Sequence, residues 1–198
     1  MSKIPLYIHI NSSGGRYIRT KLCEKYNNNF IVHHINPKLY MDIVSRNKVV
    51  RCWKYRNPAL KYNTEIKKYY NVSIFDLYDT IPFVILRDPI ERYKTENKGI
   101  TTPWKDVRSH NIICKSLYVA FTGILNDFFL EFNEEKYNNL IKFMEKISVI
   151  TLDKIYKLSN LFQFNSQPVY KPNYKEDDNN KIIKDVNYFD CKLYNLYK

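Results

Sequence analysis

The sequence is poor in glycine and cysteine, and it has no long apolar run. Only 4 Gly and 4 Cys occur among 198 residues, which excludes collagen-like repeats and disulfide-dense frameworks. No Cys-x-x-Cys pair is present, so we predict no metal site and expect free, buried thiols. Charged residues interrupt every apolar stretch before it reaches the length of a membrane-spanning helix, and we therefore expect no membrane span.

The apolar content that is present is sufficient for one folded core. Hydrophobic residues make up 44% of the chain and aromatic residues 16%, far above the level of disordered chains. The length suits one domain over residues 1–198. The first residues lack the apolar segment and cleavage site of a signal peptide, so we expect a cytoplasmic protein, in the host cell if its source is viral.

A formal net charge of +12 favours anionic partners. Nucleotides, nucleic acids and acidic glycans all fit such a charge. Basic and aromatic residues alternate over residues 48–70 and 170–175, a pattern that suits single-stranded nucleic acid. A solvated surface is the favoured interpretation of these stretches, which leaves nucleic acid as a secondary partner.

Strands and helices alternate along the chain. A β-prone run at residues 6–10 precedes small residues, and an amphipathic helix begins at Gly15. Asp88 and Asn133 are predicted to cap further helices. We predict other strands at residues 30–35, 48–53, 82–86 and 148–151, and helices at residues 60–70, 109–132, 152–162 and 187–197. This order indicates an α/β fold with a central, mostly parallel sheet flanked by helices.

The junction after the first strand is a candidate phosphate site. A small-residue loop between a strand and a helix turns backbone N–H groups toward an anion, and its candidate residues are Ser12, Ser13, Gly14, Gly15 and Arg16. Neither a Walker loop nor a Gly-x-Gly-x-x-Gly fingerprint is present, which disfavours a generic ATPase, a kinase and a dehydrogenase. An ordinary strand-to-helix turn is the alternative interpretation.

A second junction carries arginines. Residues 82–86 form an apolar run without alternation, typical of a strand buried on both faces. Arg87 leaves this strand at the edge where α/β sheets bind ligands, and its guanidinium can grip a phosphate with two N–H groups. Alternatively, Arg87 pairs with Asp88 or Glu91 to hold the turn, and a structural role of this kind suits Arg92 better.

These two junctions carry a resemblance to a known family. Residues 7–18, Tyr-Ile-His-Ile-Asn-Ser-Ser-Gly-Gly-Arg-Tyr-Ile, resemble the 5′-phosphosulfate loop of Golgi-type carbohydrate sulfotransferases, a strand followed by Pro-Lys-Thr-Gly-Gly-Thr-Ser. Residues 84–95, Val-Ile-Leu-Arg-Asp-Pro-Ile-Glu-Arg-Tyr-Lys-Thr, are similar to their 3′-phosphate motif, Leu-Arg-Asp-Pro-x-x-Arg followed by Ser. Residues 111–117 and 187–194 resemble the family segments Asn-x-x-x-Arg-x-Leu and Asn-x-x-Asp-x-x-Leu-Tyr.

The resemblance implies a short, divergent member with a P-loop-like fold. Its donor would be 3′-phosphoadenosine 5′-phosphosulfate, and its reaction the transfer of a sulfuryl group to a hydroxyl acceptor, usually on a glycan, without a metal. The donor-binding residues implied are Ser12, Ser13, Gly14, Gly15, Arg16 and Tyr17 for the 5′ group, with Arg87 and Thr95 for the 3′-phosphate.

Two functional groups of the family lack an obvious equivalent. Ser12 stands where the family has a lysine that neutralises charge on the departing oxygen, and a serine carries no such charge. Arg16 and Lys54 are candidates to replace that charge.

A general base would take the proton of the acceptor hydroxyl. We take His33 as the candidate, with His34, His110 and Glu65 as further possibilities and His9 as a packing residue. The alternative function is that of a catalytically inactive protein that binds a phosphorylated nucleotide, a glycan or nucleic acid.

Overall fold

The computed structural model describes residues 3–26, 30–34, 50–55, 64–69, 73–74, 80–96, 110–163 and 177–198. Within this part of the chain, the strands form a six-stranded sheet in the order β4-β3-β2-β1-β5-β6. The strands are β1 (Ile4–His9), β2 (Ile31–His34), β3 (Val50–Tyr55), β4 (Thr64–Tyr69), β5 (Thr80–Leu86) and β6 (Ser148–Thr151). Strands β2, β1, β5 and β6 run parallel, whereas β3 and β4 extend the sheet antiparallel.

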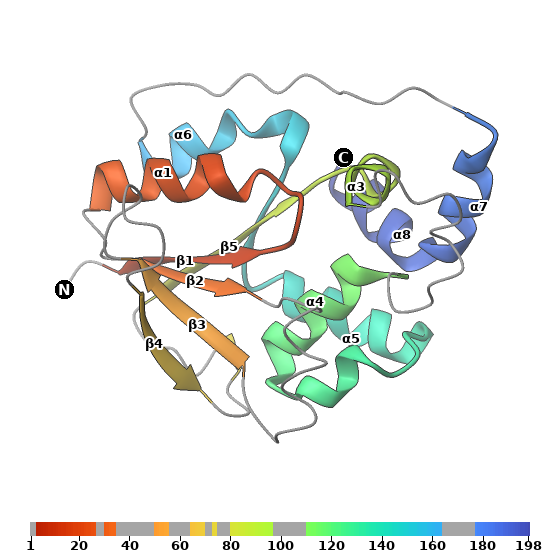
Figure 1. The fold of residues 1–198 in the computed structure, drawn as a ribbon, viewed down its shortest axis with the longest axis horizontal. Coiled ribbons are helices and arrows are strands. Elements are labelled where there is room, and N and C mark those ends of the chain that lie inside the picture. The colour runs from red at the N-terminus through yellow and green to blue at the C-terminus, as the bar shows by residue number, and fades with distance from the viewer. Residues whose placement is uncertain are drawn as a thin grey trace.

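Helices cover both faces of this sheet (Figure 1). Helices α1 and α6 lie on one face, and α4, α5 and α8 lie on the other. The α-helices are α1 (Gly15–Tyr26), α3 (Pro89–Glu96), α4 (Ile112–Thr122), α5 (Glu134–Met144), α6 (Lys157–Phe162), α7 (Asn179–Val186) and α8 (Tyr188–Tyr197). Short 3-10 turns are η4 (Leu125–Phe128) and η5 (Leu152–Lys154). The predicted α/β fold with a mostly parallel sheet flanked by helices is confirmed.

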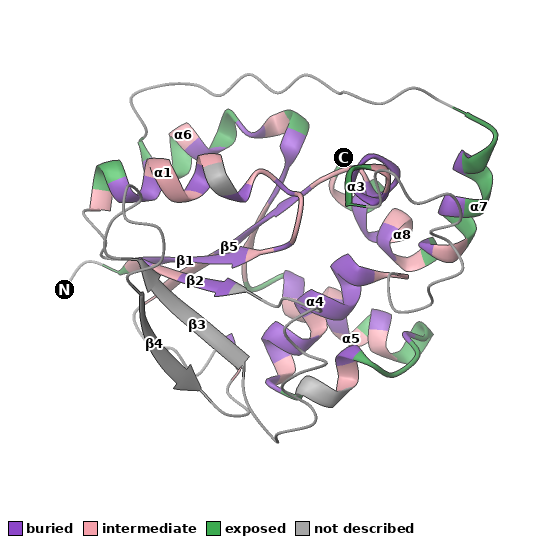
Figure 2. Ribbon diagram, in the orientation of Figure 1, coloured by how far each residue is buried: buried purple, intermediate pink, exposed green. Residues whose placement is uncertain are grey.

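The two faces of the sheet carry separate apolar clusters. In β1, Leu6 and Ile8 pack toward α4, α5 and α8, whereas Tyr7 packs toward α1 and α6. Strand β5 repeats the pattern, with Val84 facing one cluster and Phe83 the other. Successive side chains of a strand point to opposite faces, so a run that is apolar at every position is buried on both sides. Figure 2 shows this burial along β1 and β5.

Local sequence signals place several helix ends correctly. Asp88 Oδ1 accepts hydrogen bonds from the backbone N–H groups of Ile90 at 2.9 Å and Glu91 at 3.0 Å, which caps α3 as predicted. Asn133 Oδ1 accepts from Lys136 N at 3.0 Å and caps α5. The helix predicted at residues 109–132 ends earlier, because Gly123 has a φ of 74° and closes α4.

The helix predicted at residues 60–70 is wrong, since residues Thr64–Tyr69 form strand β4. This strand pairs with β3 over six residue positions and ends the sheet on that side. Its sequence, Thr-Glu-Ile-Lys-Lys-Tyr, alternates polar and apolar residues only in part. Charged side chains are common on edge strands because they discourage further pairing, so a mixed charge pattern does not distinguish this strand from a surface helix.

Three cysteines of the described residues are free thiols, as the sequence predicts. Cys23 and Cys114 are free and buried, and Cys191 is free and half-buried. Burial raises the pKa of the Cys114 thiol, with a contribution from nearby Asp190, so this thiol stays protonated and unreactive. The helices that the structure describes are all too short or too polar to cross a membrane.

Candidate functional site

Three parallel strands end at the same edge of the sheet, and each end carries polar residues. β1 leads into the loop of residues 10–14, β5 leads into Arg87, and β6 ends at Thr151. The register of β1, β5 and β6 keeps these ends in line. Ligands of open α/β sheets bind outside the carboxyl ends of the strands, so this edge is the expected place for a site.

The loop between β1 and α1 has the backbone of an anion cradle. Ser12 and Gly14 have positive φ values of 62° and 77°, and the N–H of Ser13 donates to Ile10 O at 3.3 Å. Left-handed residues beside right-handed ones turn neighbouring N–H groups to one side. The first N–H groups of α1 have no acceptor within the helix and carry its positive dipole end. The loop and the start of α1 together therefore suit a phosphate-sized anion.

The two glycines of the loop lie in crowded positions, and only Gly14 also has a left-handed backbone. Gly14 has its left-handed φ, and a Cβ there would lie 3.2 Å from Leu152 Cδ1. A Cβ on Gly15 would lie 2.0 Å from His9 Nε2. The His9 imidazole is thus packed against the first residue of α1, beside the loop. The sequence analysis predicted a packing role for His9, and this contact agrees with that prediction; the sequence did not show that the contact is made with the start of α1.

Buried hydroxyl groups gather near this edge. The hydroxyl oxygens of Ser13, Tyr17 and Thr151 are buried and have no hydrogen-bond partner within the described residues. The Ser13 side chain is fully buried. The contact of Leu152 with Gly14 brings the end of β6 next to the loop. Buried hydroxyl groups normally have partners, so these three have unused capacity to donate to a ligand.

Tyr7 holds the loop from below. Its hydroxyl donates to Ser13 O over 3.4 Å, and the side chain is fully buried in the cluster under α1. Burial raises the pKa of Tyr7, an effect that Arg19 opposes, so the hydroxyl remains a donor at all ordinary pH values. The ring of Tyr7 stacks on Phe83 with 5.1 Å between ring centres. The loop backbone is therefore tied to the rigid centre of the sheet.

Arg87 joins the two junctions. Its Nη1 donates to Ser12 O at 2.7 Å, across 75 residues of sequence, and its Nη2 pairs with Glu91 Oε1 at 3.0 Å. The pair is largely buried, with 12% of the Arg87 side chain and 3% of the Glu91 side chain exposed. Arg87 thus contacts the loop and also forms the predicted ion pair with Glu91.

Thr95 lies on the same face of α3 as Glu91, the partner of Arg87. Glu91 and Thr95 are spaced by four residues, so they lie in one row along the helix, and Arg87 lies four residues before Glu91, just outside the helix. The Thr95 hydroxyl donates to Glu91 O at 2.7 Å, and the residue is exposed. Glu91 therefore separates the two residues expected to bind a 3′-phosphate. Its carboxylate, which the sequence analysis considered only as a structural partner, reduces the net positive charge at this position.

The three catalytic candidates are not gathered at the loop. Arg16 lies in the first turn of α1, but its side chain is outside the described part of the structure. His33 is 1% exposed and pairs in register with Ile8, on the face of the sheet opposite Tyr7. Strand β3 runs antiparallel to β2, and its Trp53 pairs with Val32. Lys54 follows Trp53, so it lies near the start of β2. That edge of the sheet is opposite to the edge that carries the loop.

Of the other histidine and acid candidates, only His34 lies at this edge, because it ends parallel strand β2 in register with His9. Glu65 lies opposite Lys54 on the outer strand β4. The side chains of both residues are outside the described part. His110 precedes α4 and lines a separate pocket. Among the described residues, no group of three or more His, Cys, Asp or Glu side chains could hold a metal ion.

The two further family-like segments meet in the structure and cap each other. Asn111 has a φ of 50°, and its side-chain oxygen accepts from Phe189 N at 2.9 Å. In return, Asn187 Oδ1 accepts from Asn111 N at 3.1 Å, and Asp190 accepts from the N–H groups of Ile113 and Cys114. The starts of α4 and α8 are therefore locked together. These asparagines and the aspartate have a structural role here.

The chain matches no protein-family model, and no curated protein matches it. An assignment of function therefore depends on the site geometry and on the two junction motifs.

Proposed function

We propose that the protein is a sulfotransferase that uses 3′-phosphoadenosine 5′-phosphosulfate and transfers the sulfuryl group to a hydroxyl acceptor, with a glycan as the favoured acceptor. The observation that carries the proposal is the 2.7 Å contact of Arg87 Nη1 with Ser12 O. It brings together the two segments that resemble the donor-binding motifs. The cradle backbone and the buried hydroxyl groups at the same edge support it.

The proposal gives partners to both anionic groups of the donor. The loop N–H groups, the start of α1 and the hydroxyl groups of Ser13 and Tyr17 would hold the 5′-phosphosulfate. Arg87 and Thr95 would hold the 3′-phosphate. The reaction forms a bond from the acceptor oxygen to sulfur and breaks the bond from sulfur to the bridging oxygen, so that 3′-phosphoadenosine 5′-phosphate leaves with the electron pair.

The chain must also supply a charge and a base. Arg16, in the first turn of α1, is the proposed cation for the leaving oxygen, since Ser12 cannot provide one. For the base we now propose His9 in place of the buried His33, because the His9 ring lies against Gly15 beside the cradle. Lys54 is not part of this proposal.

Replacing Arg87 with alanine should weaken the binding of 3′-phosphoadenosine 5′-phosphate by about 1.5–3 kcal/mol, the usual worth of a hydrogen-bonded charge. Isothermal titration calorimetry on the wild type and on Arg87→Ala measures this loss. Lys94→Ala is the matched control, because Lys94 lies on α3, the helix that follows Arg87, and pairs with Asp177. Arg87→Lys keeps the positive charge but cannot form two parallel hydrogen bonds to one phosphate, so it separates the effect of charge from that of the bidentate contact.

The absence of saturable binding to the wild-type chain would overturn the donor assignment. Equal affinities of wild type and Arg87→Ala would remove Arg87 from the site. Thermal unfolding of each variant checks that the Ser12 contact is not needed for folding.

A specific observation favours the inactive binding protein as second candidate: Ser12 replaces the lysine of the family motif. Under the leading proposal, the wild-type chain transfers sulfate, and Ser12→Lys changes the rate by less than about tenfold. Ser12→Met is the control for side-chain length at this left-handed position. The measurement is sulfate transfer from the donor to a panel of neutral and acidic oligosaccharides. An inert wild type that gains activity only as Ser12→Lys would favour the second candidate.

A further inference from the structure

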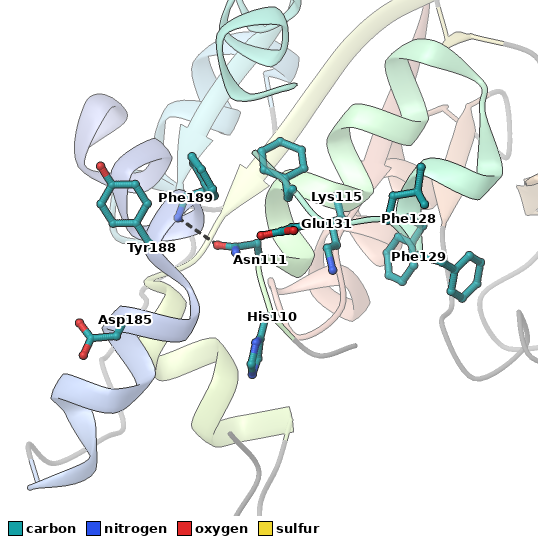
Figure 3. Close-up of a pocket in the computed structure, with 11 residues that line it drawn as sticks. His110, Asn111, Lys115, Phe128, Phe129, Glu131, Asp185, Tyr188 and Phe189 are labelled. Atoms are coloured by element: carbon teal, nitrogen blue, oxygen red, sulfur yellow. Dashed lines mark hydrogen bonds between the residues drawn. The ribbon is translucent and has the colours of Figure 1, made fainter. Parts of the chain in front are cut away.

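A pocket of about 460 Å³ lies away from the candidate donor site, at the start of α4. Residues from four segments line it: the start of α4, the turn η4 with the residues after it, the end of α7, and the start of α8. Its volume is within the range of small-molecule sites, about 300–1,000 Å³. Figure 3 shows Tyr188 and Phe189 on one side of it and Phe128 and Phe129 on the other.

Lys115 is the polar group at the centre of this pocket. Its side chain belongs to a residue that is only 6% exposed, and Figure 3 shows its amine between the two aromatic sides. No hydrogen bond or ion pair to its ammonium occurs within the described part of the chain. Buried lysines without a paired charge are rare, because an isolated ammonium loses its hydration. A ligand with negative charge would remove this deficit.

Burial lowers the pKa of Lys115, and Asp190 raises it again in part; among the other neighbouring charges, Lys136 lowers the pKa and Glu131 raises it. Asp190 is fully buried, and its carboxylate is engaged by the N–H groups of Ile113 and Cys114. It therefore does not serve as a direct partner of the lysine. The lowered pKa agrees with the geometry, because the Lys115 ammonium has no ion pair or hydrogen bond within the described residues.

The rim of the pocket is apolar and carries weak negative charge. Phe129 is 38% exposed, and Leu130 and Tyr188 are each 54% exposed, so aromatic and aliphatic surface faces solvent around the opening. Glu131 and Asp185 also line the pocket. Both are exposed, so water screens much of their charge, although Glu131 still raises the pKa of Lys115. This combination disfavours a multiply charged anion and favours one negative group on an apolar body.

Hydrogen bonds join the elements that form the walls of the pocket. The bond from Phe189 N to Asn111 Oδ1, drawn in Figure 3, measures 2.9 Å and joins the starts of α4 and α8. Asn111 N donates to Asn187 Oδ1 at 3.1 Å and closes the same junction. A preformed pocket does not have to be ordered on binding, which favours affinity.

We propose that this pocket is a binding site for a small organic monoanion with a planar aromatic body, whose sulfonate or carboxylate pairs with Lys115 while its rings lie between the aromatic side chains. This inference is independent of the proposed sulfotransferase activity, because it concerns a different set of residues.

The test uses anilinonaphthalene sulfonate as probe and phenylnaphthylamine, the same ring system without the sulfonate, as its neutral counterpart. Fluorescence titration of the wild-type chain should show saturable binding of one sulfonate probe per chain, at least tenfold tighter than the neutral probe. Lys115→Met should reduce the affinity for the sulfonate probe at least tenfold and leave the affinity for the neutral probe unchanged. Inorganic sulfate and phosphate should not displace the probe.

Matched variants separate the contributions. Lys142→Met removes an exposed lysine of α5 that lies outside the pocket, and it should leave both affinities unchanged. Tyr188→Ala should weaken both probes alike, because it removes a wall without a charge. Arg87→Ala should bind the sulfonate probe like the wild type, which keeps this site distinct from the candidate donor site.

Three results would overturn the proposal. They are equal affinities of the two probes for the wild type, an unchanged sulfonate affinity in Lys115→Met, and displacement of the probe by 3′-phosphoadenosine 5′-phosphate. Thermal unfolding of Lys115→Met confirms that the variant is folded, and unaltered binding of the neutral probe shows that the pocket is intact.

Discussion

Asp190→Ala should lower the free energy of unfolding by about 3–5 kcal/mol. The Asp190 side chain is fully buried, and its carboxylate accepts from Ile113 N at 3.0 Å and Cys114 N at 2.8 Å. Alanine would leave both N–H groups of the first turn of α4 buried without an acceptor, and each such group costs about 1–3 kcal/mol. Urea unfolding followed by circular dichroism measures the loss.

Two variants test this reason. Asp190→Asn keeps one acceptor oxygen of similar shape, so it should lose about half as much stability as alanine does. Asp178→Ala removes an exposed acid at the start of α7 that makes no cap hydrogen bond, and it should change stability by less than about 0.5 kcal/mol. A loss below about 1 kcal/mol in Asp190→Ala would show that water or rearrangement satisfies the start of α4.

Arg92→Ala should have a comparable effect, about 3–5 kcal/mol. Arg92 is the largest fully buried side chain of the described residues. Its Nη1 pairs with Glu96, while Nε and Nη2 have no hydrogen-bond partner within the described part of the chain. Truncation removes the packing of the long stem as well as the charge. Arg92→Met keeps most of the volume, so it should retain about half of the stability that alanine loses.

The charge of Arg92 acts on Asp190. Burial raises the pKa of Asp190, and Arg92 together with the two backbone N–H groups opposes that rise. Without the guanidinium, the pKa of Asp190 in the folded protein should rise further. An acid whose folded pKa is raised has its stabilising contribution below its unfolded pKa, and this contribution is lost as pH increases through the folded pKa. The deficit of Arg92→Met should therefore be larger at neutral pH than near pH 4, close to the unperturbed pKa of an aspartate.

Unfolding of Arg92→Met across this pH range tests the coupling, and Lys181→Met on the exposed face of α7 is the control for loss of a positive charge. In the double variant Arg92→Met, Asp190→Asn, the pH dependence should disappear, and the two losses should not add. A deficit that is independent of pH in Arg92→Met would mean that the arginine stabilises the fold through packing alone.

Much of the local structure could be predicted because its signals are local. Asp88 and Asn133 cap their helices through N–H groups two or three residues away. The apolar run of β5 predicts a strand buried on both faces. The loop of Ser12 and Gly14 could be located from small residues between a strand and a helix. In each of these cases, the interacting groups are neighbours in the chain.

The composition of the candidate site could be predicted in part. The two junctions were found in the sequence, and their alignment follows from parallel strands that end at one edge. Arg87 was assigned to phosphate binding, yet only the structure places it against Ser12 O and Glu91 at the same time. Lys54 was placed at the loop from the sequence alone, but the antiparallel direction of β3 takes it to the other edge.

By itself, the sequence determined an α/β fold with a mostly parallel sheet flanked by helices, and the positions of two strand-to-helix junctions. Only the tertiary structure decided that His9 packs on Gly15, that β4 is a strand, and that the starts of α4 and α8 cap each other around a pocket containing Lys115. The physical reason is sequence separation. Capping and burial patterns depend on residues within a few positions, whereas these features depend on pairing and packing between segments whose relative positions the complete fold sets.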